Sequence, residues 1–397
     1  MCLNYGRKMA SCGAAMADVQ RLRQQLDDFF NDLKAYGPKR GGRLDLLPPA
    51  VEDDGDEESG GGPDAPSDYP YSYSQPSEVP EVVGFERGPS EEHRPTAAVD
   101  AGVMRLGESE DGLVIALRGA IVVRDGLRSV TGLVRSGPIF LGWEHEAQLL
   151  LMLGEWLGDP GYYVAAERIE GGGYRAGRLK DGVGGRKYLA DRFRAGLERY
   201  CQRLAAASVK NGTLLLDGSL TLRSRDTPDA YLNQIAYLAG RGGNSIVGLS
   251  KKSELVVGGR AVPYWLDDQP AVPCHRALTP ILRWEDALAP SGHGGRADRV
   301  MGNVYAARLS ALGPTFRMDV KAAPGVTDEA AIGGFFRSVN IYCGYPTLLA
   351  RAHAACYVSS ADFLALQVQA TGEFGLRPQR PAVSLKGAFA PFGGSYK

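Results

Sequence analysis

The stretch TLLLDGSL, residues 213–220, decides the fold class. Thr213 and three leucines form a strand-type run that ends in Asp217, and Gly218 supplies a turn. Strong helix patterns precede and follow it, YLADRFRAGLERYCQRLAAA (188–207) and DAYLNQIAYLAG (229–240), and a second strand, SIVGLS (245–250), comes next. This alternation predicts an α/β arrangement, in which ligands gather at the carboxyl ends of strands.

Further elements extend this pattern in both directions, and the folded body is expected to begin near Arg94. Upstream, we expect a short apolar run at TAAVDAGV (96–103), a strand or bent strand pair at GLVIALRGAIVV (112–123), a helix at HEAQLLLMLGEWLG (145–158) and a glycine-rich basic loop at 171–187. Downstream, we expect a strand at TFRMDV (315–320) and a helix over YPTLLARAHAACYV (345–358) with Pro346 at its first position. The sequence therefore predicts a mixed central sheet flanked by helices.

The N-terminal region has a different character. Residues 17–36 carry an amphipathic helix pattern through Val19, Leu22, Leu26, Phe29 and Leu33. The following stretch is rich in Gly, Pro, Ser and acidic residues, which favours a disordered linker. We expect a helical arm at 1–39, an acidic linker at 40–93 and a folded domain at 94–397 with an insertion around 125–185. The apolar helix face should be covered by the body of the chain, a second protomer or another partner.

Charge is distributed unevenly along the 397 residues. The formal net charge is −1, but residues 45–94 contain fourteen acidic side chains against two arginines, which leaves the rest of the chain at +11. A basic folded part suits a polyanion such as DNA, although a solvated basic helix face would have the same composition. No run has the ~20 apolar residues of a membrane helix, and no secretory signal opens the chain, so we expect a cytoplasmic protein.

Asp100 and Asp217 share a local context, because each ends an apolar run and is followed by small residues. Two carboxylates on neighbouring strands can bind divalent cations and let a phosphate backbone approach, as phosphodiester cleavage requires. The alternative is that each aspartate only caps a turn. The six cysteines form no CxxC pair, which argues against a cysteine-zinc site, and the chain has no Walker or GxGxxG motif for nucleotides.

Four motifs together resemble the NurA nuclease family: AAVDAG (97–102), LLLDGSL (214–220), GLSKKSEL (248–255) and GYPTLLARAHAACYV (344–358). They occur in the family's order over roughly residues 94–380. The resemblance implies an RNase H-like core and a manganese-dependent nuclease, with Mg²⁺ possible, acting on single- and double-stranded DNA as a 5'–3' exonuclease and single-strand endonuclease. It also implies a homodimer that works with a hexameric HerA-type ATPase in DNA end resection and double-strand-break repair. For the apolar face of the N-terminal helix, the resemblance favours packing against the second protomer or the ATPase ring.

Individual residues are assigned by the same resemblance. Asp100 and Asp217 match the metal-binding aspartates, and Glu198 is the best match for the intervening glutamate, with Glu167 and Glu170 as alternatives. Tyr345 and His353 match the family's late tyrosine and histidine. From the residues themselves, Lys251 and Lys252 could neutralise phosphate charge, and Asp319 is a weaker ligand candidate. His275, beside Cys274, has no partner at metal spacing, and His293 lies in a glycine-rich loop.

Two functions from different classes therefore remain. The first is a carboxylate-bound metal nuclease that hydrolyses phosphodiester bonds in DNA. The second is a catalytically weak DNA-binding or adaptor subunit of a translocase ring on the same fold. Asp100, Asp217 and His353 favour the enzyme.

Overall fold

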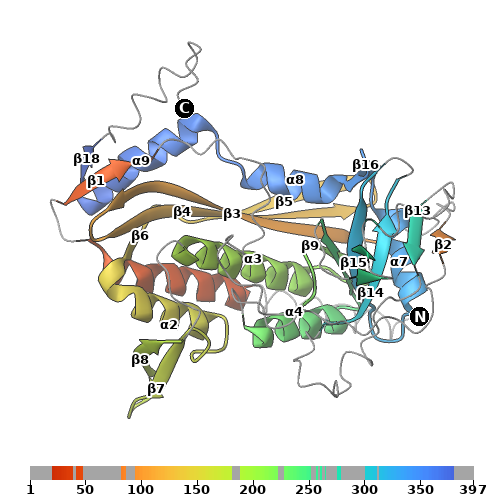
Figure 1. Cartoon of the computed structure of the whole chain (residues 1–397), viewed down its shortest axis with the longest axis horizontal. Coiled ribbons are helices and arrows are strands. Elements are labelled where there is room, and N and C mark those ends of the chain that lie inside the picture. Colours follow the sequence, from red (N-terminus) through yellow and green to blue (C-terminus); the bar gives the residue numbers. More distant parts are fainter. Residues whose placement is uncertain are drawn as a thin grey trace, which may run out of the picture.

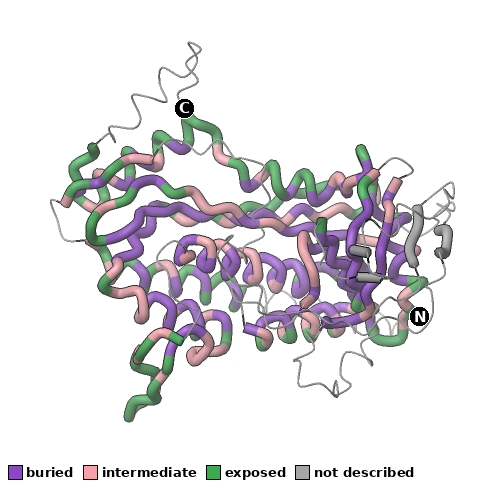
Figure 2. Tube along the Cα trace, viewed as in Figure 1, coloured by how far each residue is buried: buried purple, intermediate pink, exposed green. Residues whose placement is uncertain are grey.

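A twelve-stranded mixed sheet forms the centre of the molecule. The structure, a computed structural model, describes residues 20–38, 42–47, 94–180, 188–221, 228–251, 300–310 and 313–379, together with Tyr264 and the backbone of strands at 82–85, 256–257, 260–261 and 275–278. Figure 1 shows the sheet between two layers of helices, and Figure 2 shows that its strands are largely buried. The predicted α/β fold with a mixed sheet flanked by helices is therefore confirmed.

The strands around Asp100 and Asp217 have the RNase H-like arrangement. Strands β3 (Thr96–Ser109), β4 (Gly112–Asp125) and β5 (Arg128–Arg135) form an antiparallel meander. On the other side of β3, β9 (Thr213–Asp217) and then β10 (Ser245–Ser250) run parallel to it. Strands β15 (Thr315–Lys321) and β14 (Asn303–Arg308) extend the sheet in antiparallel pairing. The run at 112–123 is thus one continuous strand.

Shorter strands complete the sheet at its ends. Strand β6 (Ile139–Gly142) pairs with β4, β1 (Arg43–Leu46) lies between β3 and β18 (Arg377–Gln379), and β13 (His275–Leu278) lies between β14 and β2 (Val82–Phe85). Three two-stranded pairs lie outside it: β7 (Val164–Arg168) with β8 (Tyr174–Leu179), β11 (Val256–Val257) with β12 (Arg260–Ala261), and β16 (Ile341–Tyr342) with β17 (Tyr345–Pro346).

Helices cover both faces of the sheet. On one face lie the helix at 20–33, α2 (Glu146–Trp156), α3 (Leu189–Ser208) and α4 (Asp229–Arg241). On the other lie α7 (Asp328–Ser338), α8 (Thr347–Cys356) and α9 (Ser360–Phe374). Alternate residues of the strands face the two layers, as the period of two requires: Val99 packs in the α3 layer and Ala98 in the α8 layer. None of the described helices is long and apolar enough to cross a membrane.

The N-terminal helix packs on the body of its own chain. Leu22, Leu26, Phe29 and Leu33 are all buried in the core on the α3 side, and the Phe29 ring stacks on Trp156 with ring centroids 4.3 Å apart. The expectation that this face favours a second protomer or an ATPase ring is therefore wrong for these four residues. Val19 lies outside the described residues.

The predicted linker at 40–93 contains two strands. Residues 43–46 form β1 and residues 82–85 form β2, and both pair with the main sheet. Leu44 is fully buried, so composition averaged over the whole stretch concealed one residue that contributes to the core. The prediction of disorder does not hold for these segments, and the remainder of the stretch, apart from residue 42 and Leu47, lies outside the described residues.

The region around 125–185, where an insertion is predicted, contains two kinds of structure. Strands β5 and β6 belong to the main sheet, whereas β7 and β8 form a hairpin that projects from α2 in Figure 1. The loop predicted at 171–187 is therefore partly strand. Gly171, Gly172 and Gly173 make the tip, with φ values of +92°, +95° and +88° that side chains disfavour.

Candidate active site

Asp100 and Asp217 lie next to each other on the face of the sheet that α8 covers. The parallel pairing of β3 with β9 matches Val99 with Leu216, so the next residue of each strand is an aspartate. Asp217 is the last residue of β9 and is followed by Gly218, whose φ is +109°. Asp100 instead lies within β3, which continues beyond the end of β9, so the expectation that it ends a strand is wrong. The two carboxylates still meet where the parallel pairing stops.

The segment from β17 through α8 supplies two partners for these carboxylates. Tyr345 donates a hydrogen bond from its hydroxyl to Asp217 Oδ2 at 3.0 Å. His353 Nδ1 lies 2.9 Å from Asp100 Oδ2, and 61% of the histidine side chain is exposed. Tyr345 belongs to β17 and α8 begins at Thr347, so Pro346 occupies the N-cap and not the first helical position. The strand residue and the helix residue nevertheless reach adjacent carboxylates.

Lys251 brings a positive charge to the same place. It follows β10, in which Leu249 pairs with Asp217, and its Nζ lies 3.8 Å from Asp217 Oδ2. The same Nζ lies 5.2 Å from the centre of the Tyr345 ring, within the range of a cation–π contact. Lys252, the other predicted phosphate contact, lies outside the described residues.

Burial and charge act in opposite directions on Asp217. Removal from water raises the pKa of its carboxyl and ionised Asp100 adds to that rise, while Lys251 and the Tyr345 hydroxyl lower the pKa. The net effect is a raised pKa, so keeping the Asp217 carboxylate ionised in the folded protein costs free energy. A bound cation would relieve that cost, because it adds positive charge beside both aspartates.

Glu198 approaches the aspartates from α3, on the opposite side of the sheet from α8. Burial raises the pKa of its carboxyl, Arg194 and Arg199 lower it, and Asp100 and Asp217 raise it, so the three carboxylates influence one another. Its oxygens accept hydrogen bonds from Gln202 at 2.9 Å and Arg194 at 3.2 Å. Glu198 therefore lies near the pair but is held by residues of its own helix.

The two alternative glutamates lie elsewhere. Glu167 is part of β7 and Glu170 belongs to the turn after it, both exposed on the hairpin that projects from α2. The structure thus places Glu198, and neither Glu167 nor Glu170, near Asp100 and Asp217. His275 lies in β13, for which only the backbone is described, and His293 lies outside the described residues.

Asp319, which the sequence suggested as a weaker metal-ligand candidate, instead has a structural role. It is fully buried, and both of its oxygens accept hydrogen bonds from Arg317, at 2.8 and 2.9 Å. Its Oδ2 also accepts from the backbone N–H of Leu220 at 2.7 Å, and Arg317 donates to Thr221 Oγ1 at 3.1 Å. This buried pair therefore fixes the loop that follows Asp217.

The spacing of Arg317 and Asp319 in the sequence could have indicated this ion pair, although neither residue ends a strand. Arg317 and Asp319 are two residues apart on one strand, so their side chains point to the same face. A buried arginine beside a carboxylate with the same orientation predicts an ion pair, because either charge alone would be costly to bury.

The chemistry of the donors fits a hard divalent cation. Asp100 and Asp217 offer carboxylate oxygens from adjacent strands, and Asp217 Oδ1 has no hydrogen-bond partner among the described residues. Asp100 Oδ1 accepts a 2.7 Å hydrogen bond from the Ala101 N–H, which fixes its orientation. Within the described part of the chain, no three His, Cys, Asp or Glu side chains are grouped closely enough to form a metal site. A cation here would thus be held by the aspartate pair, with water completing its coordination.

Replacing Glu198 with glutamine should stabilise the metal-free protein. Because burial raises the pKa of this carboxyl and two ionised aspartates lie near it, the charge opposes folding at neutral pH. Glutamine keeps the shape and removes the charge, so we expect a gain of about 1 kcal/mol in the free energy of unfolding. Urea unfolding at pH 7 with EDTA measures it, and Glu144→Gln, at an exposed position, is the matched control. A loss of stability in Glu198→Gln would mean that Arg194 outweighs the cost of burial.

Comparison with known proteins finds similarity at the level of structure. No protein-family model matches the sequence, and no curated protein matches it. The chain is similar to the crystal structure of the NurA nuclease from Sulfolobus solfataricus, with 14% identity and a TM-score of 0.40 over 80% of this chain and 89% of that one.

Two endonuclease V structures are also similar to the chain. One, from Ciona intestinalis, is bound to DNA containing an inosine; it has 10% identity and a TM-score of 0.32 over 69% of this chain and 86% of that one. The other, the human catalytic domain, has 14% identity and a TM-score of 0.31 over 72% and 86% of the two chains.

Proposed function

We propose that this protein is a metal-dependent DNA nuclease of the NurA type whose active site is the Asp100–Asp217 pair. One observation carries the proposal. Four of the residues assigned from the sequence motifs, from segments that are far apart in the chain, meet in one place: Asp100, Asp217, Tyr345 and His353. If each aspartate only capped its own turn, there would be no reason for a tyrosine and a histidine from a third segment to contact the pair.

The side chains around the pair suit hydrolysis of a phosphodiester. A divalent cation bound there would supply a nucleophilic water at neutral pH and positive charge for the phosphate in the transition state. Lys251, beside Asp217, can add positive charge toward a phosphate oxygen. His353 is exposed enough to meet a substrate and could pass a proton to the leaving oxygen, while Asp100 holds its ring. Tyr345 fixes the rotamer of Asp217 and the position of Lys251.

The finer parts of the proposal come from the motifs. We propose that Mn²⁺ or Mg²⁺ serves as the cation, because both prefer carboxylate oxygens. We also propose that the protein cuts from 5' ends and within single strands, forms a homodimer, and acts in DNA end resection with a HerA-type ATPase. The chain has no motif for ATP hydrolysis, so translocation along DNA would need such a partner.

The test is incubation of the purified chain with 5'-labelled linear DNA and with circular single-stranded DNA, in Mn²⁺, Mg²⁺ or EDTA. A nuclease of this type should degrade linear DNA and nick the single-stranded circle only when a cation is present. An adaptor subunit that has lost catalysis would bind both substrates and leave both intact in every buffer, which would contradict the proposal.

A further inference from the structure

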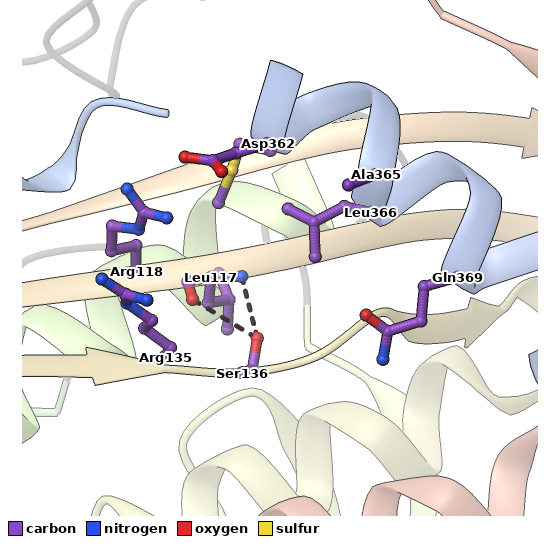
Figure 3. Close-up of a pocket in the computed structure, with 9 residues that line it drawn as sticks. Leu117, Arg118, Arg135, Ser136, Asp362, Ala365, Leu366 and Gln369 are labelled. Atoms are coloured by element: carbon purple, nitrogen blue, oxygen red, sulfur yellow. Dashed lines mark hydrogen bonds between the residues drawn. The ribbon is translucent and has the colours of Figure 1, made fainter. Parts of the chain in front are cut away.

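A cavity of about 240 Å³ lies beside the candidate active site, between the sheet and α9. Figure 3 shows two arginines, Arg118 of β4 and Arg135 of β5, on one side of the cavity, with Asp362 of α9 above them and Gln369 of α9 on the opposite side. Met104, Leu117, Ser136, Ala365 and Leu366 complete the lining. The cavity is large enough for a phosphate group, and nothing in the motifs assigned above accounts for it.

The two arginines place like charges directly opposite each other. Arg118 and Arg135 are register partners in the antiparallel pair of β4 and β5. Such an arrangement is destabilising by itself, because side chains at paired positions are close neighbours. Neither guanidinium has an ion-pair partner among the described residues: Arg118 donates to the carbonyl oxygen of Tyr357 at 2.8 Å, and Arg135 is exposed with no such bond. An anion between them would remove the repulsion.

Phosphate suits these side chains in geometry as well as charge. A guanidinium presents parallel N–H groups that match two oxygens of a phosphate. The Gln369 amide can add a neutral donor, since its one bond, to Glu373, is long at 3.5 Å. Ser136 Oγ already accepts a hydrogen bond from the backbone N–H of Leu117, so the hydroxyl is less available to a phosphate. Asp362 is the one carboxylate in the lining, and its charge should weaken the affinity for an anion.

The cavity and the aspartate pair lie along one face of the sheet. Arg118 pairs with Gly102, which is two residues beyond Asp100 on β3, a step of about 7 Å. Helix α8 runs over the same distance: its His353 contacts Asp100, its Cys356 packs on Gly102, and the next residue, Tyr357, accepts the bond from Arg118. A strand whose scissile phosphate lies at Asp100 could therefore reach the arginines with a neighbouring phosphate.

We propose that Arg118 and Arg135 form a second phosphate-binding subsite, which holds the backbone of a single DNA strand next to the cleaved bond. This inference rests on the proposed function for the identity of the ligand. The subsite contacts phosphate and not bases, so it contributes affinity without sequence preference. It also sets the direction in which the strand leaves the active site, toward α9.

The test measures binding separately from cleavage. Anisotropy of a fluorescein-labelled 20-nucleotide single strand is titrated with full-length protein in EDTA over a series of salt concentrations. Arg135→Gln should raise Kd at least about fivefold at low salt and reduce the slope of log K against log salt by about 0.7, the value for one lost phosphate contact on a single strand. Arg128→Gln, on the same strand but opposite Asp125, is the matched control and should change neither quantity. Asp362→Asn should tighten binding.

The possible outcomes separate the phosphate subsite from the proposed nuclease activity. If the wild type binds and Arg135→Gln has the same Kd and salt slope, the subsite is wrong and the nuclease proposal stands. If Arg135→Gln weakens binding but the wild type cuts no DNA with either cation, the subsite stands and the nuclease proposal fails. If the wild type binds no DNA, both fail. Arg135 is exposed and its substitution removes the repulsion from Arg118, so Arg135→Gln should melt no lower than the wild type, which excludes misfolding as the cause.

Discussion

Asp217→Asn and Asp100→Asn should each lower the rate of DNA cleavage at least about a hundredfold while the protein remains folded. Asparagine keeps the size of each side chain, and at position 217 its amide oxygen can still accept the hydrogen bond that the Tyr345 hydroxyl donates to Asp217 Oδ2. What is lost is the negative charge that would hold a cation, and a metal ligand contributes several kcal/mol to stabilising a transition state of phosphodiester hydrolysis. Single-turnover cleavage of a labelled oligonucleotide in Mn²⁺ measures the effect.

The control for this pair is Asp32→Asn, on the exposed face of the N-terminal helix. It should cleave at the wild-type rate. Asp217→Asn should melt no lower than the wild type in EDTA, since burial raises the pKa of Asp217 and its charge opposes folding. Cleavage at the wild-type rate by either purified variant would remove that aspartate from the active site.

Phe29→Ala should lower the free energy of unfolding by about 3–5 kcal/mol, the usual cost of removing a buried phenylalanine. Its ring lies 4.3 Å from the Trp156 ring and 6.1 Å from the Phe193 ring, between the N-terminal helix and helices α2 and α3. Loss of the ring leaves a cavity that these rigid helices close only in part. Urea unfolding followed by tryptophan fluorescence measures the change, and Trp156 makes the signal sensitive to this contact.

The adjacent residue supplies the control. Phe30 is only partly buried at the edge of the same core, so Phe30→Ala should cost clearly less than Phe29→Ala. If the two substitutions cost the same, or if Phe29→Ala costs under about 1 kcal/mol, the helix at 20–33 is not part of the folded core. The face it presents would then be available to a partner, as the sequence alone had suggested.

Local patterns in the sequence predicted the elements around Asp217 well. The β9 strand has the bounds that TLLLD indicated, because a short apolar run that ends in Asp-Gly leaves few alternatives. Helices α3 and α4 lie within one residue of their predicted bounds, since their apolar residues recur at helical spacing. These elements carry Glu198 and Asp217, two of the five residues assigned to the site, so the local patterns placed both on their correct elements.

The position of Asp100 in its strand was not predictable in the same way. Ala101 and Gly102 suggested a turn after the aspartate, but β3 continues through both residues to Ser109. Gly102 instead packs against α8, where a Cβ at this position would lie 3.4 Å from the carbonyl oxygen of Cys356. A contact with a helix 254 residues later leaves no trace in the local pattern, and the same applies to Phe29 on Trp156.

Mn²⁺ binding followed by electron paramagnetic resonance tests directly whether Asp100 and Asp217 hold the cation, because free Mn²⁺ gives a sharp signal and bound Mn²⁺ does not. The wild-type chain should reduce the free signal, and the Asp100→Asn/Asp217→Asn double variant should leave it unchanged at the same protein concentration. Equal binding of Mn²⁺ by the wild type and by a folded double variant would contradict the claim that the Asp100–Asp217 pair holds the catalytic cation.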